Sequence, residues 1–397
     1  MVAEDPRVGG GRTPGRAAFW NDRDVRAVLY QVLLVLGIGA VAWYLIHNTL
    51  ANLAARNIAT GFGFLGRESG FPIGESLIAY TPANTYLRAL LVGLLNTLKV
   101  ASIGVVLATI WGTLLGVARL SSNWLIRQLA SWYVEALRNT PLLLQLFLWY
   151  AILQGLPAVR LAFNPLPGIY LSQKGLVFPV IGLEPVHAVM AALFVVGIGL
   201  SWWWAGRAKA HQNATGQIRP VLLPSLGLIV GLPVIAWLIA GAPFEPDVPV
   251  LRGFNFQGGA AISPEFTALL FGLVVYTASY IAEIVRAGIQ AVPRGQSEAA
   301  RALGLPAGRI LRLIVLPQAL RVIVPPMTSQ YLNLTKNSTL AVAIGFPDIL
   351  STINTSINQT GQPIECIAIV MVVFLIVSLS ISAFMNWYNA RIRLIER

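Results

Sequence analysis

The chain has 397 residues, of which 56% are hydrophobic and only 11% are charged. A soluble domain devotes about a quarter of its residues to charge, so the composition excludes an ordinary soluble globular protein and indicates a protein built for lipid. The formal net charge is +12, but the basic residues lie between apolar segments and no aromatic-rich RNA-binding motif accompanies them, which argues against a nucleic-acid partner. The single cysteine, Cys366, offers no internal disulfide and no Cys/His metal site.

Eight apolar stretches are long enough to cross a bilayer, which takes about 20 mainly apolar residues in a helix. We therefore predict an all-α integral membrane protein with about eight transmembrane helices. The predicted spans are approximately Val28–Ile46, Leu87–Val117, Leu129–Leu153, His187–Ala205, Val221–Ala240, Phe266–Ile289, Val322–Ile344 and Ile364–Met385. The third and the seventh are the least apolar.

The distribution of basic residues predicts the orientation, because short loops rich in Lys and Arg stay in the cytoplasm. With the N-terminus inside, the cytoplasmic segments hold most of the arginines, including those between Arg286 and Arg321 and those from Arg391 to Arg397. Both termini are then cytoplasmic. The first apolar run, followed by small residues such as Ala51 and Ala54, is also compatible with a secretory signal, whose removal would leave the other seven orientations unchanged.

A cytoplasmic loop between the sixth and seventh spans carries the most specific pattern in the chain. Glu298-Ala299-Ala300 is followed by Gly304, and then by Ile314, Leu316 and Pro317. Three residues separate the alanine pair from the glycine, nine separate the glycine from the isoleucine, and one separates the isoleucine from Leu-Pro.

Elementary helix chemistry predicts two short helices in this loop. Ser297 is expected to cap the first helix, and Glu298 suits its positive end. Gly304 is expected to end this helix in a left-handed turn. Pro306 suits the first turn of a second short helix, which Pro317 is expected to end or kink.

The spacing resembles the EAA loop of ABC importer permeases, with every fixed position matched. The resemblance implies a coupling helix that docks on a separate ATPase subunit and transmits its closing motion. The residues expected to carry the coupling are Glu298, Ala299, Ala300, Arg301, Leu303, Gly304, Arg309 and Pro317. The alternative is a helical hairpin that merely joins two spans, with its arginines obeying the positive-inside rule.

Three further segments resemble the polar amino acid uptake branch of these permeases: Tyr133–Gln145, Tyr276–Gln296 and Leu334–Leu340. The resemblance covers about residues 87–154 and 264–390 and implies the five-helix core of a type I ABC importer. The longer permeases of the general L-amino acid and the glutamate/glutamine/aspartate importers are similar in plan.

The resulting organisation has six parts. They are a flexible cytoplasmic tail (1–27), an additional span with its periplasmic loop (28–86), the first part of the core (87–154), an insertion with spans four and five (155–263), the second part of the core (264–390) with the coupling loop (293–317), and a short cytoplasmic tail (391–397).

The chain lacks the G-x-x-x-x-G-K-[ST] loop that holds ATP phosphates, and it lacks the common hydrolase motifs. We therefore expect a non-enzymatic subunit without a cofactor of its own, with ATP and Mg bound by a partner. The resemblance implies two ABC ATPase subunits, a second homologous permease and a periplasmic amino acid-binding protein, in a bacterial inner membrane.

Charged residues inside the predicted spans are functional candidates, because charge in a membrane is costly and normally faces the bundle interior or a water-filled path. Lys99 and Lys336 fall near mid-span. Two acid-base pairs lie one turn apart, Glu135 with Arg138 and Glu283 with Arg286. The simplest interpretation is that the partners of each pair neutralise each other or link neighbouring helices.

A dense polar patch in the seventh span is the other candidate for a substrate path. It comprises Gln330, Asn333, Lys336, Asn337, Ser338 and Thr339, and Glu135 and Arg138 are added to it as path candidates. These groups could meet the carboxylate and ammonium of an amino acid. The alternative is a polar seam that packs against the sister permease through helix-to-helix hydrogen bonds.

These observations predict a permease subunit that moves polar L-amino acids from periplasm to cytoplasm by alternating access. An ion-coupled secondary transporter is the first alternative, since midplane polar residues would also suit it, but no internal repeat supports it. A channel is the second alternative, and neither a filter loop nor a charged ring is visible in the sequence.

Overall fold

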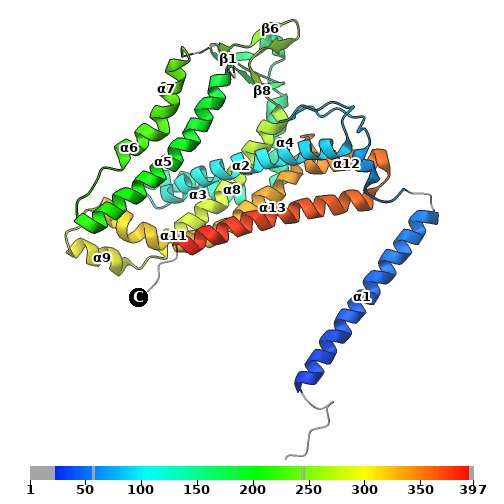
Figure 1. Ribbon diagram of the computed structural model, residues 1–397, viewed down its shortest axis with the longest axis horizontal. Helices are drawn as coiled ribbons and strands as arrows, with labels where there is room; N and C mark the ends of the chain where they lie inside the picture. Colours follow the sequence, from blue (N-terminus) through cyan, green and yellow to red (C-terminus); the bar gives the residue numbers. More distant parts are fainter. Residues whose placement is uncertain (1–22, 56–58, 183, 243, 245, 393–397) are drawn as a thin grey trace, which may run out of the picture.

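The computed structural model describes residues 23–55, 59–182, 184–242, 244 and 246–392. Long helices dominate it, and most of them lie side by side in one bundle, while α1 stands apart at one end (Figure 1). Seven helices in the described part of the chain are long and apolar enough to cross a membrane: Val25–Ala55, Tyr86–Ala118, Pro185–Thr215, Leu222–Ile239, Pro264–Gln290, Ala307–Ile344 and Pro363–Arg391. The predicted membrane fold is therefore confirmed.

The bundle is built from helices of both halves of the chain. Its members are α2 (Tyr86–Ala118), α3 (Trp124–Arg138), α4 (Leu142–Gln154), α8 (Pro264–Gln290), α11 (Leu316–Asn337), α12 (Ile349–Thr360) and α13 (Pro363–Ile392). Four helices of the additional segments lie outside it: α1 (Arg23–Ala55), α5 (Pro185–Thr215), α6 (Leu222–Leu226) and α7 (Leu232–Ile239), with a π-helical segment, Gly227–Gly231, between the last two. The short helices α9 (Arg294–Ala302) and α10 (Ala307–Ile310) connect α8 to the path that leads into α11.

The third predicted span is two helices rather than one. The break between α3 and α4 falls at Asn139-Thr140-Pro141, because proline supplies no backbone N–H and disfavours a helical residue before it. Gln145 compensates for the break: its Nε2 donates to the carbonyl of Leu137 at 2.9 Å and to that of Thr140 at 3.0 Å. A short apolar helix, Leu142–Gln154, completes this crossing.

The seventh predicted span belongs to a longer helical path, 307–344, and Pro317 does not end it. A π-helical segment, Leu311–Val315, lies directly before the proline, and Gln318 Nε2 donates to the Ile314 carbonyl at 3.0 Å. The path tightens into a 3₁₀ helix, Ser338–Ile344, which ends at Gly345 with φ 80°. The proline is therefore accommodated by a local change of helix type.

The loops at one end of the bundle form short strands that the sequence did not predict. They are β1 (Phe163–Leu166), β2 (Ile169–Ser172), β3 (Gly175–Phe178), β4 (Val180–Ile181), β5 (Pro246–Asp247), β6 (Val250–Arg252), β7 (Asn255–Gln257) and β8 (Ala260–Ile262). Strands β1, β2, β3 and β8 make one antiparallel sheet, in which Leu176 pairs with Ile262. The sheet thereby joins the two loops that flank α5 to α7, so this hairpin leaves and re-enters the bundle at one place (Figure 1).

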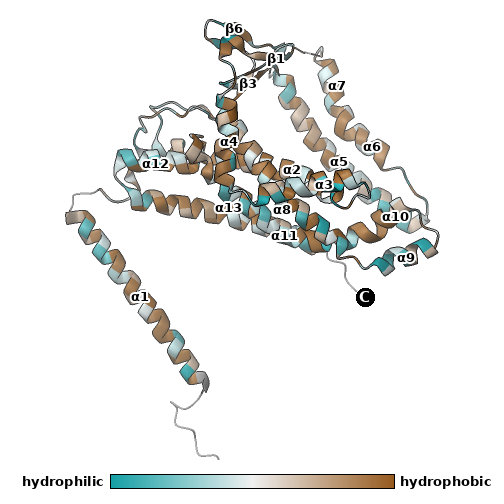
Figure 2. Ribbon diagram, turned by 180° about the vertical axis from the view of Figure 1, so that it is seen from behind, coloured by the Kyte–Doolittle hydropathy of each residue, from teal (hydrophilic) through white to brown (hydrophobic). Residues whose placement is uncertain are grey.

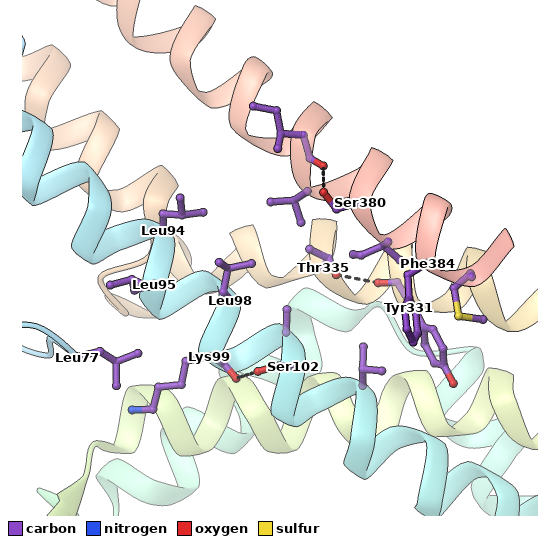
Figure 3. Close-up of a pocket in the computed structure, with 16 residues that line it drawn as sticks. Leu77, Leu94, Leu95, Leu98, Lys99, Ser102, Tyr331, Thr335, Ser380 and Phe384 are labelled. Atoms are coloured by element: carbon purple, nitrogen blue, oxygen red, sulfur yellow. Dashed lines mark hydrogen bonds between the residues drawn. The ribbon is translucent and has the colours of Figure 1, made fainter. Parts of the chain in front are cut away.

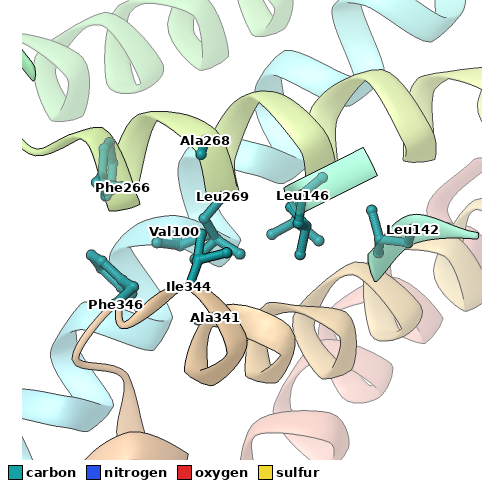
Figure 4. Packing of buried hydrophobic residues seen from close by; sticks show 10 residues of the cluster. Val100, Leu142, Leu146, Phe266, Ala268, Leu269, Ala341, Ile344 and Phe346 are labelled. Carbon is teal, nitrogen blue, oxygen red and sulfur yellow. The ribbon is translucent and has the colours of Figure 1, made fainter. Parts of the chain in front are cut away.

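Close contact between α2 and α8 forms the centre of the bundle. A Cβ added at Gly112 would lie 2.6 Å from Ile281 Cβ, and one at Gly116 would lie 2.8 Å from the Ala282 carbonyl oxygen, so only glycine permits this approach. Toward the sheet, buried side chains of α4, α8 and the 3₁₀ helix interlock, among them Leu146, Leu269 and Ile344 (Figure 4). Apolar residues cover much of the outer surface of the long helices (Figure 2), as expected for contact with lipid.

Candidate coupling and translocation surfaces

The EAA loop folds into α9 (Arg294–Ala302) and α10 (Ala307–Ile310) at the end of the bundle opposite the sheet (Figure 1). Two details of the sequence prediction are corrected. Pro293, with φ −58°, takes the N-cap position of α9, four residues before the expected cap, so Ser297 lies within the helix. Pro306 directly precedes α10 rather than lying in its first turn.

The expected left-handed turn at Gly304 is confirmed, with φ 77°. The Gly304 N–H donates to the Arg301 carbonyl at 2.9 Å, and the Leu305 N–H donates to the Ala300 carbonyl at 3.1 Å. These two bonds satisfy carbonyls that a helix end otherwise leaves without partners. The turn leaves Leu303 82% exposed, while Ala300 is buried.

Most of the expected coupling residues are exposed. Glu298, Ala299, Arg301, Leu303, Gly304 and Arg309 are exposed, whereas Ala300 is buried and Pro317 is partly buried. A cavity of about 460 Å³ separates α9 from the last turn of α8 and is lined by Gln290, Glu298 and Arg301 among others. The loop therefore leaves Leu303 and Arg301 exposed at the tightly capped end of α9, and Arg309 exposed in α10.

The polar patch of the seventh span is split between two sides of its helix. Asn333 and Lys336 are exposed, and Gln330 and Asn337 are partly exposed. Ser338 is buried and its Oγ donates to the Thr335 carbonyl at 2.7 Å, while Thr339 Oγ1 donates to the Lys336 carbonyl at 2.7 Å. Because these two hydroxyls are satisfied by nearby backbone carbonyls, the open part of the predicted patch consists of the other four residues.

The expected pair of Glu135 with Arg138 does not form among the described residues. Glu135 is exposed, whereas Arg138 turns toward α8, where its guanidinium lies 5.0 Å from the centre of the Tyr280 ring. Its Nη1 lies 4.0 Å from Glu283 Oε2. The reason is position: Arg138 is the last residue of α3, so its side chain reaches the neighbouring helix before the chain breaks.

The second expected pair, Glu283 with Arg286, does form and is part of a larger cluster. Arg119, at the C-terminal end of α2, donates to the same carboxylate. Arg119 was missed by the sequence analysis because it reads as one more cytoplasmic loop arginine. The only available signal was its position directly after an apolar span.

Lys99 is paired at the opposite end of the bundle. Its Nζ lies 2.6 Å from Glu75 Oε1, in the loop before α2, and 4.4 Å from the centre of the Phe266 ring. Ser263 Oγ donates to Glu75 Oε2 at 2.9 Å, and Asn96 Nδ2 donates to the Glu75 carbonyl at 2.8 Å. Lys99 also borders a mainly apolar cavity of about 900 Å³ between α2, α11 and α13 (Figure 3).

Among the described residues, no group of three or more His, Cys, Asp or Glu side chains is placed to hold a metal ion. The polar features are therefore the exposed EAA loop, the exposed polar residues of α11, the ion cluster around Glu283 and the Glu75–Lys99 ion pair.

Comparison with known proteins gives a consistent result. Residues 197–394 match the family model described as the binding-protein-dependent transport system inner membrane component. The chain is 47% identical over 396 residues to the general L-amino acid transport system permease protein AapQ of Rhizobium johnstonii, an alignment that covers 97% of this chain and 98% of that protein.

Two further relatives also align along nearly their whole length. The putative amino-acid ABC transporter permease protein YhdX of Escherichia coli is 50% identical over 385 residues, covering 96% of this chain and 98% of the relative. The glutamate/glutamine/aspartate/asparagine transport system permease protein BztB of Rhodobacter capsulatus is 40% identical, with both chains covered completely. The chain therefore belongs to the binding-protein-dependent inner membrane components, as a multi-pass permease of the amino acid ABC transporter family.

Proposed function

We propose that this chain imports polar L-amino acids by alternating access and is driven through its EAA loop by a separate ATPase. The observation that carries the proposal is the geometry of the loop, in which α9 ends at a left-handed turn at Gly304 and Arg301, Leu303 and Arg309 are exposed. The loop directly connects α8 to the helical path that leads into α11. A push on α9 is thereby delivered to two helices of the bundle.

The substrate path is assigned to the open side of α11 and to Arg138. Asn333 and Lys336 are exposed there, and the other faces of α11 pack against α2, α8 and α13. An ammonium and amides on this side could meet the carboxylate of an amino acid, and the same side would face a second permease. Relatives named for general L-amino acids and for glutamate, glutamine, aspartate and asparagine support a polar amino acid as cargo.

The proposed assembly contains two ABC ATPase subunits that bind ATP and Mg, a second homologous permease and a periplasmic amino acid-binding protein. The sheet end of the bundle would face the periplasm, while α9 and both termini would face the cytoplasm of a bacterial inner membrane. Within the chain, the five-helix core comprises 87–154 and 264–390, and the segments 28–86 and 155–263 are additions to it.

The test is uptake of labelled glutamate, glutamine, histidine and leucine into vesicles that contain the partner subunits, with wild type and Gly304→Asp compared. Asp is strained at φ 77° and brings a charge to the loop surface. The matched control is Gly216→Asp, because Gly216 ends α5 with φ 71° and also has open space around it. We expect ATP-dependent and binding-protein-dependent uptake in wild type and control, and at least a tenfold loss in the assembled Gly304→Asp complex.

Two results would contradict the proposal. One is uptake that follows an ion gradient without ATP. The other is normal transport by a correctly assembled Gly304→Asp complex.

A further inference from the structure

Glu283 connects three helices near the end of the bundle that leads into α9. Its carboxylate accepts hydrogen bonds from Arg119 of α2 and Arg286 of α8, and Arg138 of α3 lies 4.0 Å away. Arg286 extends the cluster toward the end of α8, because its Nη1 donates to Gln290 Oε1 at 2.8 Å. Pro293, the N-cap residue of α9, lies three residues after Gln290.

Beside this ion cluster, α2, α3 and α8 also meet through apolar contacts. Leu115, Ala130, Val134, Ala278 and Ala282 form the buried apolar cluster where α2, α3 and α8 meet. Most of these side chains are small, and apolar contact has no preferred direction. Charge-assisted hydrogen bonds are directional and strengthen where water is scarce. Glu283 therefore supplies a directional restraint that the apolar contacts lack.

The cluster contains three arginines and one carboxylate, so the restraint depends on Glu283. Among the described residues, Glu283 is the only carboxylate within 4.0 Å of these three guanidiniums. The Arg119 side chain is only 12% exposed, so water screens its charge poorly. Without Glu283, three cations would face one another and favour separation of the helix ends.

We propose that Glu283 is a positioning residue that makes the ends of α2, α3 and α8 move as one unit when α9 is displaced. The inference rests on the proposed function, in which an ATPase acts on α9. In this proposal, the ion cluster transmits the displacement of α9 to α2 and α3, neither of which is joined directly to the EAA loop.

The first experiment measures the number of ATP molecules hydrolysed per amino acid imported by the reconstituted complex. We expect Glu283→Gln to lower uptake about tenfold and ATPase activity less than twofold, so the ratio rises at least fivefold, and Glu283→Asp to recover most of the loss. Glu75→Gln is the matched control, because it removes a carboxylate that pairs with α2 at the opposite end, and its ratio should equal that of wild type. An unchanged ratio in Glu283→Gln would overturn the inference, while absence of ATP-driven uptake in wild type would instead overturn the proposed function.

A second variant separates transmission from folding. Glu283→Gln combined with Arg119→Gln removes the most buried of the cations left without a counter-charge, so assembly and thermal stability should return toward wild type. We expect the ATP-to-substrate ratio to stay high in this double variant, because the ion pair that connects α2 to α8 is still missing. Recovery of a normal ratio together with stability would show that Glu283 serves folding only.

Discussion

Asp348 is a fully buried carboxyl group with an incomplete set of partners. It precedes α12, outside the long helices, and its Oδ1 accepts the Ser351 N–H at 2.8 Å. Its Oδ2 has no hydrogen-bond partner among the described residues. Burial is the largest influence and raises the pKa of Asp348 to about 7.

This shift predicts a pH-dependent cost of folding. Between the unfolded pKa of about 3.9 and the folded pKa of about 7, the folded state holds a proton that the unfolded state has released, so stability falls as pH rises through this window. Asp348→Asn keeps the cap and cannot ionise. Its stability relative to wild type should therefore grow between pH 4 and pH 7, by at most about 1.4 kcal/mol per pH unit, and level off above pH 7.

Thermal unfolding of both proteins at several pH values checks this prediction. Because all other titrating groups are shared, the difference in Tm between the two proteins isolates Asp348. A difference that does not change with pH would contradict the assigned pKa.

At the scale of elements, the break between α3 and α4 depends on a side chain from the second helix. Gln145→Leu would leave the carbonyls of Leu137 and Thr140 without their Gln145 donor. Gln145 is 3% exposed, so water does not replace the amide easily. We expect a loss of about 1–3 kcal/mol in stability, the usual cost of unsatisfied buried polar groups.

The control for this prediction is Gln154→Leu, at the other end of α4. Gln154 is exposed, and among the described residues its Nε2 donates only to the Tyr150 hydroxyl, at 3.0 Å. We expect its melting temperature to stay close to that of wild type. Equal melting temperatures for the two variants would mean that the carbonyls at the break find other donors.

At the scale of the whole molecule, the distribution of basic residues predicts that the sheet end of the bundle faces the periplasm and that α9 and α10 face the cytoplasm. Leu166, in β1, is 60% exposed at the sheet end, and Gly308 is exposed in α10 at the opposite end. In right-side-out membranes, an impermeant maleimide should label Leu166→Cys at once and Gly308→Cys only after permeabilisation. The native Cys366 is buried and should stay unlabelled. The reverse pattern would invert the proposed topology.

Local features were readable from the sequence because they depend on neighbouring residues. Apolar length located the spans, and glycine at position 304 predicted the left-handed turn, since that conformation is strained for other residues. The spacing from Glu298 to Pro317 led to the family. The same local reasoning misplaced the start of α9, because Pro293 and not Ser297 occupies the N-cap position.

Tertiary structure alone decided which charges meet and how the inserted loops pair. Arg119 and Glu283 are 164 residues apart, and Glu75 and Lys99 are 24 residues apart, so no helical period relates either pair. Strand β3 pairs with β8 although the helices α5 to α7 separate the two strands along the chain. The physical reason is that hydropathy and capping act within a few residues, whereas these contacts exist only after helix packing has brought distant segments together.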